Sequence, residues 1–114
     1  LDDDADTLEA TRLLLERWGC RVQTSQDWTK TKSAIFDVLI CDYELSVEMS
    51  GIDVVSALRA DGHQVPAVMI SGNTSVELRD AAEALAIPLL HKPIRPVQLR
   101  SALLNALTRS SEPA

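Results

Sequence analysis

Five residues whose side chains could act on phosphate or on a metal ion lie just after short apolar segments of the chain. They are Asp2, Asp3, Asp42, Ser71 and Lys92. If the apolar segments are parallel strands, their carboxyl ends meet at one edge of a sheet, where the ligands of open α/β sheets bind. The pattern therefore predicts one site made of three carboxylates, a hydroxyl and an ammonium group.

The residue types in this set suit phosphoryl chemistry with a divalent cation. Carboxylates held close together repel one another unless a cation joins them, and oxygen ligands favour Mg²⁺, with Mn²⁺ as the alternative. Lys92 would bring positive charge to a phosphate oxygen, and Ser71 would donate a hydrogen bond. Phosphoryl transfer depends on positioning and charge neutralisation, and one of the carboxylates could be the nucleophile.

The elements that must position these residues alternate between helix-like and strand-like hydrophobic patterns, which predicts βα units around a parallel sheet. Leu1 resembles the last residue of a strand whose body is absent from this sequence. We expect helices over 6–18, 27–35, 52–61, 76–85 and 96–109, and strands over 20–24, 38–41, 67–70 and 88–91.

Local signals refine the helices. Asp6 and Glu9 have the spacing of a capping box, and Gly19 stands where the residue after a helix C-cap belongs. Helical spacing predicts that the core-facing side chains of the helix over 76–85 are Val76, Ala82 and Leu85.

The 114-residue chain has the size of one domain, which we place at 1–109 with a flexible tail at 110–114. Its formal net charge of -6 should repel nucleic acid and anionic membranes. Its apolar runs are far shorter than the ~20 residues that cross a bilayer, and it opens on acids rather than on a signal peptide. We expect Cys20 and Cys41 to be reduced, buried thiols of a cytoplasmic protein.

Four motifs, in this order, resemble those of a response-regulator receiver domain. They are Leu1-Asp2-Asp3-Asp4, Val38-Leu39-Ile40-Cys41-Asp42, Met69-Ile70-Ser71-Gly72 and His91-Lys92-Pro93. The resemblance covers essentially the whole sequence apart from the missing start of the first strand. It implies a doubly wound, CheY-like (flavodoxin-like) α/β fold. The five parallel strands would have the order 2-1-3-4-5, with the first strand truncated here.

The resemblance also implies a role for each carboxylate. Asp42 would accept a phosphoryl group from a phosphohistidine, in a Mg²⁺-dependent reaction typical of bacterial two-component signalling. Asp3, Asp42 and the backbone carbonyl of Glu44 would bind the metal, and Asp2 would support it through water.

The remaining site residues would bind the phosphoryl group or set its lifetime. Ser71 and Lys92 would contact it and drive a conformational switch, and Gly72 would leave room for it. Glu44 and Asn73 stand two residues past the acceptor and past the hydroxyl, at positions that tune self-dephosphorylation, which we expect to be slow.

The stretch 71–104 most resembles receivers at the C-terminus of hybrid sensor histidine kinases. The implied partner is a histidine kinase or a phosphotransfer domain, without contact of this domain with nucleic acid or membrane. A dimer could form through the last helices and strands. Leu89 departs from the family, because receivers commonly carry an aromatic switch residue at that position.

Two alternatives remain open at this point. A Mg²⁺ phosphohydrolase of the haloacid-dehalogenase type also uses Asp, Ser or Thr, and Lys in this order. It needs a second Asp where this chain has Glu44, and it usually needs a cap domain. The other alternative is a receiver-like interaction module that is never phosphorylated; Asp42 and Lys92 argue against it. The pattern leaves open whether the parent protein is an enzyme.

Overall fold

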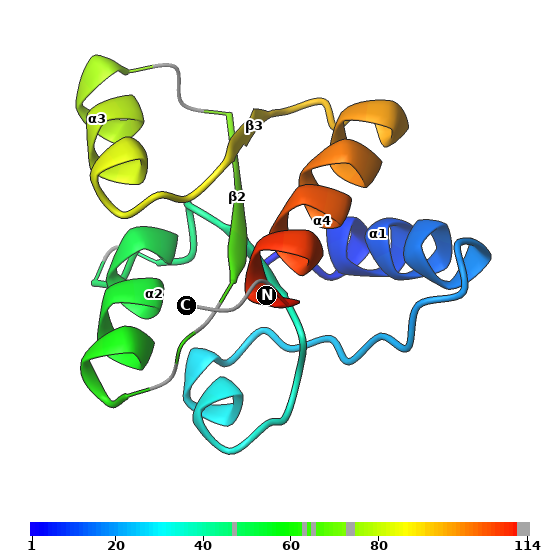
Figure 1. The fold of residues 1–114 in the computed structure, drawn as a ribbon, viewed down its shortest axis with the longest axis horizontal. Helices are drawn as coiled ribbons and strands as arrows, with labels where there is room; N and C mark the ends of the chain where they lie inside the picture. Colours follow the sequence, from blue (N-terminus) through cyan, green and yellow to red (C-terminus); the bar gives the residue numbers. More distant parts are fainter. Residues whose placement is uncertain (47, 63, 65, 73–74, 112–114) are drawn as a thin grey trace.

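The computed structural model describes residues 1–46, 48–62, 64, 66–72 and 75–111, and its helices cover both faces of a parallel sheet (Figure 1). The helices are α1 (Ala5–Arg17), α2 (Gly51–Ala60), α3 (Val76–Ala84) and α4 (Pro96–Ser111), with a 3₁₀ helix, η1 (Trp28–Lys32). The strands are β1 (Leu39–Asp42), β2 (Ala67–Ser71) and β3 (Leu89–His91).

The sheet has three strands in the order β1-β2-β3, which corrects the predicted five-stranded sheet for the part of the chain that the structure describes. The predicted third, fourth and fifth strands are present in the expected order. The predicted second strand, over 20–24, is not assigned as a strand. A strand needs a neighbouring backbone to pair with, and within the described ranges a single backbone hydrogen bond, from Asp2 N to Ser25 O, joins the segment after α1 to the N-terminal residues.

Leu1, which we predicted to end a first strand, lies beside β1. The amino group of Leu1 donates to Ile40 O at 2.7 Å, and Asp42 N donates to Leu1 O at 2.9 Å. On the other side, Asp2 N donates to Ser25 O at 3.3 Å. Leu1 therefore lies beside β1 as a continuation of the sheet. The segment after α1 lies next to Leu1 and Asp2, on the side away from β1.

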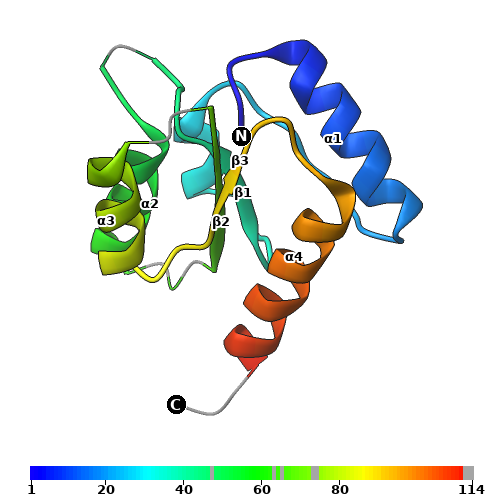
Figure 2. The same ribbon diagram turned by 90° about the horizontal axis from the view of Figure 1, so that it is seen from above.

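The sheet separates two helical layers, with α2 and α3 on one face and α1 and α4 on the other (Figures 1 and 2). Strand β2 is buried along its whole length, and its side chains alternate between the layers. Met69 packs in the cluster that contains Val54 and Leu58 of α2, while Val68 packs against Ala102 of α4. This two-sided burial explains the continuous apolar runs in the sequence.

The start of α1 corrects the predicted capping box at Asp6. Asp4 is the N-cap: its side chain accepts from Asp6 N at 3.0 Å and from Thr7 Oγ1 at 2.9 Å. Several neighbouring acids can cap a helix. Asp4 is the N-cap because its extended backbone directly precedes the first helical residue. The predicted end is confirmed, since Gly19 follows the C-cap with a φ of 84°.

Two further predictions on burial were partly wrong. On α3, Val76 is 63% exposed and Leu78 is buried instead, together with the predicted Ala82. Of the two cysteines, both free, Cys41 is buried but Cys20 is exposed.

Helix α4 continues to Ser111, beyond the start of the expected tail, and 112–114 lie outside the described residues. No helix in the described ranges is both long and apolar enough to cross a membrane.

Candidate functional site

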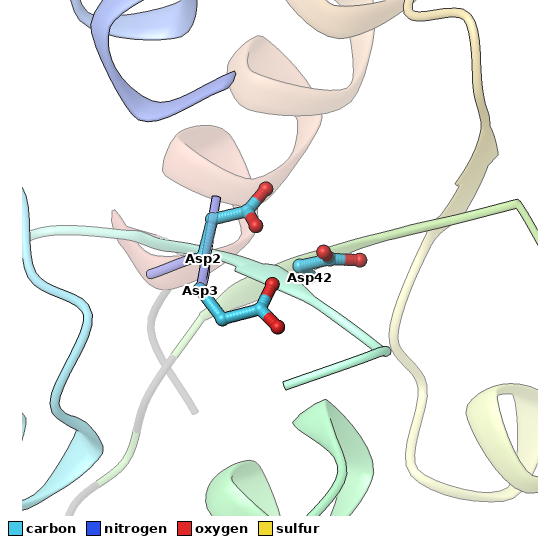
Figure 3. A group of neighbouring side chains, drawn as sticks. All are labelled: Asp2, Asp3 and Asp42. Atoms are coloured by element: carbon cyan, nitrogen blue, oxygen red, sulfur yellow. The ribbon is translucent and has the colours of Figure 1, made fainter. Parts of the chain in front are cut away.

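The five residues singled out by the sequence come together at the carboxyl edge of the sheet. Asp42 is the last residue of β1, Ser71 is the last residue of β2, and Lys92 follows β3 directly. The backbone N–H of Lys92 donates to Ser71 O at 2.9 Å, which fixes the two neighbouring strand ends to each other. Asp2 and Asp3 reach the same edge from the segment beside β1 (Figure 3).

The carboxylates of Asp2, Asp3 and Asp42 form a compact group, with oxygens within 4.8 Å of one another. Figure 3 shows Asp2 and Asp3 extending toward Asp42 from the N-terminal segment. Asp2 and Asp42 are buried, with exposed fractions of 6% and 3%, whereas Asp3 is exposed. Hydrogen bonds order the segment, from Asp4 N to Asp2 Oδ1 at 2.9 Å and from Gln26 Nε2 to Asp3 O at 2.9 Å.

This donor set fits a hard divalent cation. All the side-chain donors are carboxylate oxygens, they are close enough to share one ion, and one of them faces solvent, where water can complete the coordination. Mg²⁺ is bound in this way, by one or two carboxylates together with water and phosphate oxygens. A cation would also offset the repulsion among the acids.

Asp42 is held in a strongly perturbed environment. Its Oδ2 accepts from Lys92 Nζ at 3.1 Å, and its Oδ1 accepts from Glu44 N at 3.3 Å. Burial raises the pKa of Asp42 to about 7, and the neighbouring Glu44 and Asp2 add to this rise, while Lys92 opposes it. Burial works to lower the pKa of Lys92, but the contact with Asp42 outweighs it, so that the pKa is raised and the ammonium ion persists.

Ser71 and Glu44 make a contact that the sequence did not predict. Ser71 is fully buried, and its Oγ donates to Glu44 Oε1 at 2.6 Å. Desolvation works to raise the pKa of Glu44, but hydrogen bonds with Ser71 and Asp42 outweigh it, so the pKa of Glu44 is lowered. The two residues are distant in sequence, so no local spacing could have indicated the pair.

Gly51 is a second feature that the sequence analysis missed. It begins α2 directly behind the acceptor, and its N–H donates to Tyr43 O at 2.9 Å. A Cβ built on Gly51 would lie 2.5 Å from the backbone oxygen of Asp42 and 2.5 Å from Met69 Sδ. Only glycine allows this approach of the helix to the strand end. Gly51 is the first helical residue after the N-cap Ser50, and a glycine inside a helix, where its helix propensity is poor, was the available signal.

Three further positions that the sequence analysis assigned to the site are Gly72, Leu89 and Asn73. Gly72 is exposed, with open space where a Cβ would be. Leu89 is half-buried in β3 and packs against the core beside α2 and α3. Asn73 lies outside the described residues.

Comparisons with known proteins agree with this architecture. The family model described as "Response regulator receiver domain" matches residues 1–104. The chain is 34% identical over 112 residues to the response regulator protein TmoT of Ectopseudomonas mendocina, covering 94% of this chain and 50% of that protein. It is 30% identical over 114 residues to the phosphoglycerate transport system transcriptional regulatory protein PgtA of Salmonella typhimurium, covering 94% of this chain and 27% of that protein.

Solved structures give the same result for the fold. Chemotaxis protein CheY4 of Vibrio cholerae superposes with a TM-score of 0.74 at 30% identity, covering 95% of this chain and 92% of that one. A receiver domain protein from Clostridium thermocellum superposes with a TM-score of 0.82 at 24% identity, covering 96% and 91%. The chain belongs to the response-regulator receiver family, and it spans a half or less of the curated relatives named above.

Proposed function

We propose that this domain is a working phosphorelay receiver, in which Asp42 accepts a phosphoryl group from a phosphohistidine. The observation that carries the proposal is the environment of Asp42. Its carboxylate is 3% exposed at the end of β1, with the carboxylates of Asp2 and Asp3 on one side and Lys92 Nζ 3.1 Å away on the other. Membership of the receiver family supports the same assignment.

The transfer balances as a substitution at phosphorus. A carboxylate oxygen of Asp42 attacks the phosphorus of the phosphohistidine, a P–O bond forms, and the P–N bond to the imidazole breaks. The imidazole nitrogen leaves with the electron pair of that bond and takes up a proton. The product is an acyl phosphate on Asp42. Lys92, already paired with this carboxylate, would stay beside it and pair with an oxygen of the phosphoryl group.

Mg²⁺, or Mn²⁺, bound at the carboxylate group would neutralise charge on the phosphoryl oxygens. Asp3, Asp42 and the backbone carbonyl of Glu44 would hold the ion, and Asp2 would act through water. Asp2 is buried and accepts a hydrogen bond from Asp4 N, which suits a supporting role, while the exposed Asp3 can adjust to the ion.

The switch would pass through Ser71 and Lys92. These residues end neighbouring strands, and the backbone hydrogen bond between them would couple a movement of one to the other. Gly72 would let the chain after β2 approach the phosphoryl group. Leu89 would leave this domain without an aromatic switch side chain. Glu44 and Asn73 would set a slow rate of self-dephosphorylation.

The partner that supplies the phosphoryl group would be a histidine kinase or a phosphotransfer domain in the bacterial cytoplasm. The relatives described above are named as a response regulator and a transcriptional regulatory protein, which favours a response regulator over a hybrid kinase as the parent protein. The domain itself, with a net charge of -6, would not contact nucleic acid or membrane. The last helices and strands could form a dimer interface.

The test is the intact mass of the protein after incubation with acetyl phosphate, with and without Mg²⁺, for the wild type and for Asp42→Asn. We expect a Mg²⁺-dependent gain of about 80 Da, the mass of one phosphoryl group, that is absent in the variant. An unchanged mass while Mg²⁺ binds would instead support the unphosphorylated interaction module. Continuous release of phosphate without a trapped adduct would support the phosphohydrolase.

A further inference from the structure

The hydroxyl of Ser71 is already committed to a partner while Asp42 is unmodified. Ser71 Oγ lies 2.6 Å from Glu44 Oε1, in hydrogen-bond geometry in which the hydroxyl donates and the carboxylate accepts. Ser71 is fully buried, so bulk water does not compete for its hydroxyl, although the Glu44 residue that accepts the bond is itself exposed. A hydrogen bond to an ionised acceptor is about twice as strong as a neutral one.

A serine hydroxyl has one proton to donate. In the phosphorylated state of the proposed function, the phosphoryl oxygens need that proton. The Glu44 carboxylate already accepts this proton in a hydrogen bond from Ser71. Glu44 stands two residues past Asp42, and its backbone N–H donates to Asp42 Oδ1 at 3.3 Å. The phosphoryl group and the Glu44 carboxylate would therefore compete for a single donor at close range.

We propose that Glu44 is a latch that holds the Ser71 hydroxyl in the unphosphorylated state, and that phosphorylation of Asp42 releases it. The inference rests on the proposed function and assigns to Glu44 a positioning role toward Ser71. Two effects drive the release. The phosphoryl dianion repels the carboxylate of Glu44, and it offers Ser71 a stronger acceptor. The latch sets a threshold, because the Ser71–Glu44 bond must break before Ser71 can stabilise the phosphoryl group.

The energetic consequence is measurable with beryllofluoride, a phosphoryl analogue that binds an aspartate without a kinase. Removing the latch with Glu44→Ala should tighten Mg²⁺-dependent beryllofluoride binding by about tenfold, the low end for a hydrogen bond to a charged group. Glu44→Gln keeps an acceptor oxygen but removes the charge, so its affinity should fall between those of the wild type and Glu44→Ala.

Loss of the Glu44 charge would by itself favour binding of an anion, so the test needs a double-mutant cycle with Ser71→Ala. In the Ser71→Ala background no hydroxyl is held, and the gain from Glu44→Ala should shrink to about threefold or less. Glu48 is the control, since it is an exposed acid in the same loop. Glu48→Ala should change the affinity by less than about twofold in either background.

The outcomes separate this inference from the proposed function. Equal gains from Glu44→Ala in both backgrounds would overturn the latch while leaving phosphoryl acceptance intact. Wild-type protein that shows no Asp42-dependent binding of beryllofluoride would overturn both. The Glu44→Gln variant changes almost no volume, and the same cycle with Ser71→Ala, run with Glu44→Gln, decides the question if Glu44→Ala proves poorly folded.

Discussion

At the scale of single residues, the carboxyl group of Asp42 combines two opposing demands. It must be buried and close to other acids to form the site, and this raises its pKa to about 7 from an ordinary value of 3.8. It must also be ionised to act as a nucleophile. Lys92 favours the ionised form from within the chain, and a bound cation would favour it further.

The raised pKa makes the stability of the metal-free protein depend on pH. The native state binds the proton of Asp42 more tightly than the unfolded state does, so the free energy of unfolding falls as pH rises from about 4 to about 7. Asp42→Asn cannot ionise and escapes this loss. Its stability relative to the wild type should therefore grow by on the order of 2 kcal/mol between pH 5 and pH 8, at about 1.4 kcal/mol per unit.

Urea unfolding in a chelating buffer at the two pH values measures this difference. The change of this stability difference between the two pH values is compared, because the loss of the Asp42–Lys92 ion pair in the variant then cancels. A stability difference between Asp42→Asn and the wild type that is the same at both pH values would show that Asp42 is not the group responsible.

At the scale of elements, the close contact between the start of α2 and the end of β1 depends on a glycine. A Cβ at position 51 would meet the backbone of Asp42, which cannot move without disturbing the acceptor. We expect Gly51→Ala to lower the free energy of unfolding by about 1–3 kcal/mol and to reduce phosphoryl uptake. Gly72→Ala is the matched control for stability alone, because open space surrounds its Cβ position.

Thermal unfolding of both alanine variants, together with acetyl phosphate uptake of Gly51→Ala, provides the measurement. Equal stability of the Gly51→Ala and Gly72→Ala proteins would contradict the close approach of α2 to β1.

The face that α3 turns toward the sheet can be tested in the same way. Leu78 is 3% exposed and Val76 is 63% exposed. Leu78→Ala should therefore cost about 2–5 kcal/mol of stability, while Val76→Ala should stay within about 0.5 kcal/mol of the wild type. Denaturant unfolding of the two variants decides between this burial and the one that the sequence pattern predicted, in which Val76 faces the core.

The strands and helices also show which parts of the fold could be predicted from the sequence. The strands β1 and β2 were predictable, because a short, continuous apolar run between loops is typical of a strand buried on both faces. The shorter β3 is only half-buried, and its apolar pair Leu89-Leu90 between Pro88 and Pro93 was the available signal. Val76 was misplaced because helical spacing allows more than one face over a short helix. The predicted strand over 20–24 is not formed, because its prediction assumed a neighbouring first strand, and Leu1 is the one residue that we assigned to that strand. The Glu44–Ser71 contact joins separate loops, and only the folded chain brings them together.

At the scale of the whole molecule, a net charge of -6 weakens the folded state through general repulsion, and the carboxylates at the sheet edge add a local share. Any salt screens the general part. A specifically bound cation should add stability through binding alone, about 1.4 kcal/mol at ten times its dissociation constant. The increase in melting temperature should be about 5 °C for a domain of this size.

Separating the two contributions requires a comparison at constant ionic strength. MgCl₂ should raise the melting temperature more than NaCl of equal ionic strength, and Asp3→Asn should remove most of that excess, because Asp3 is a member of the carboxylate group. Glu48→Gln removes the same charge outside the group and should keep the excess. If both variants lose it equally, Mg²⁺ acts on the overall charge of the molecule, and the sheet edge is not a metal site.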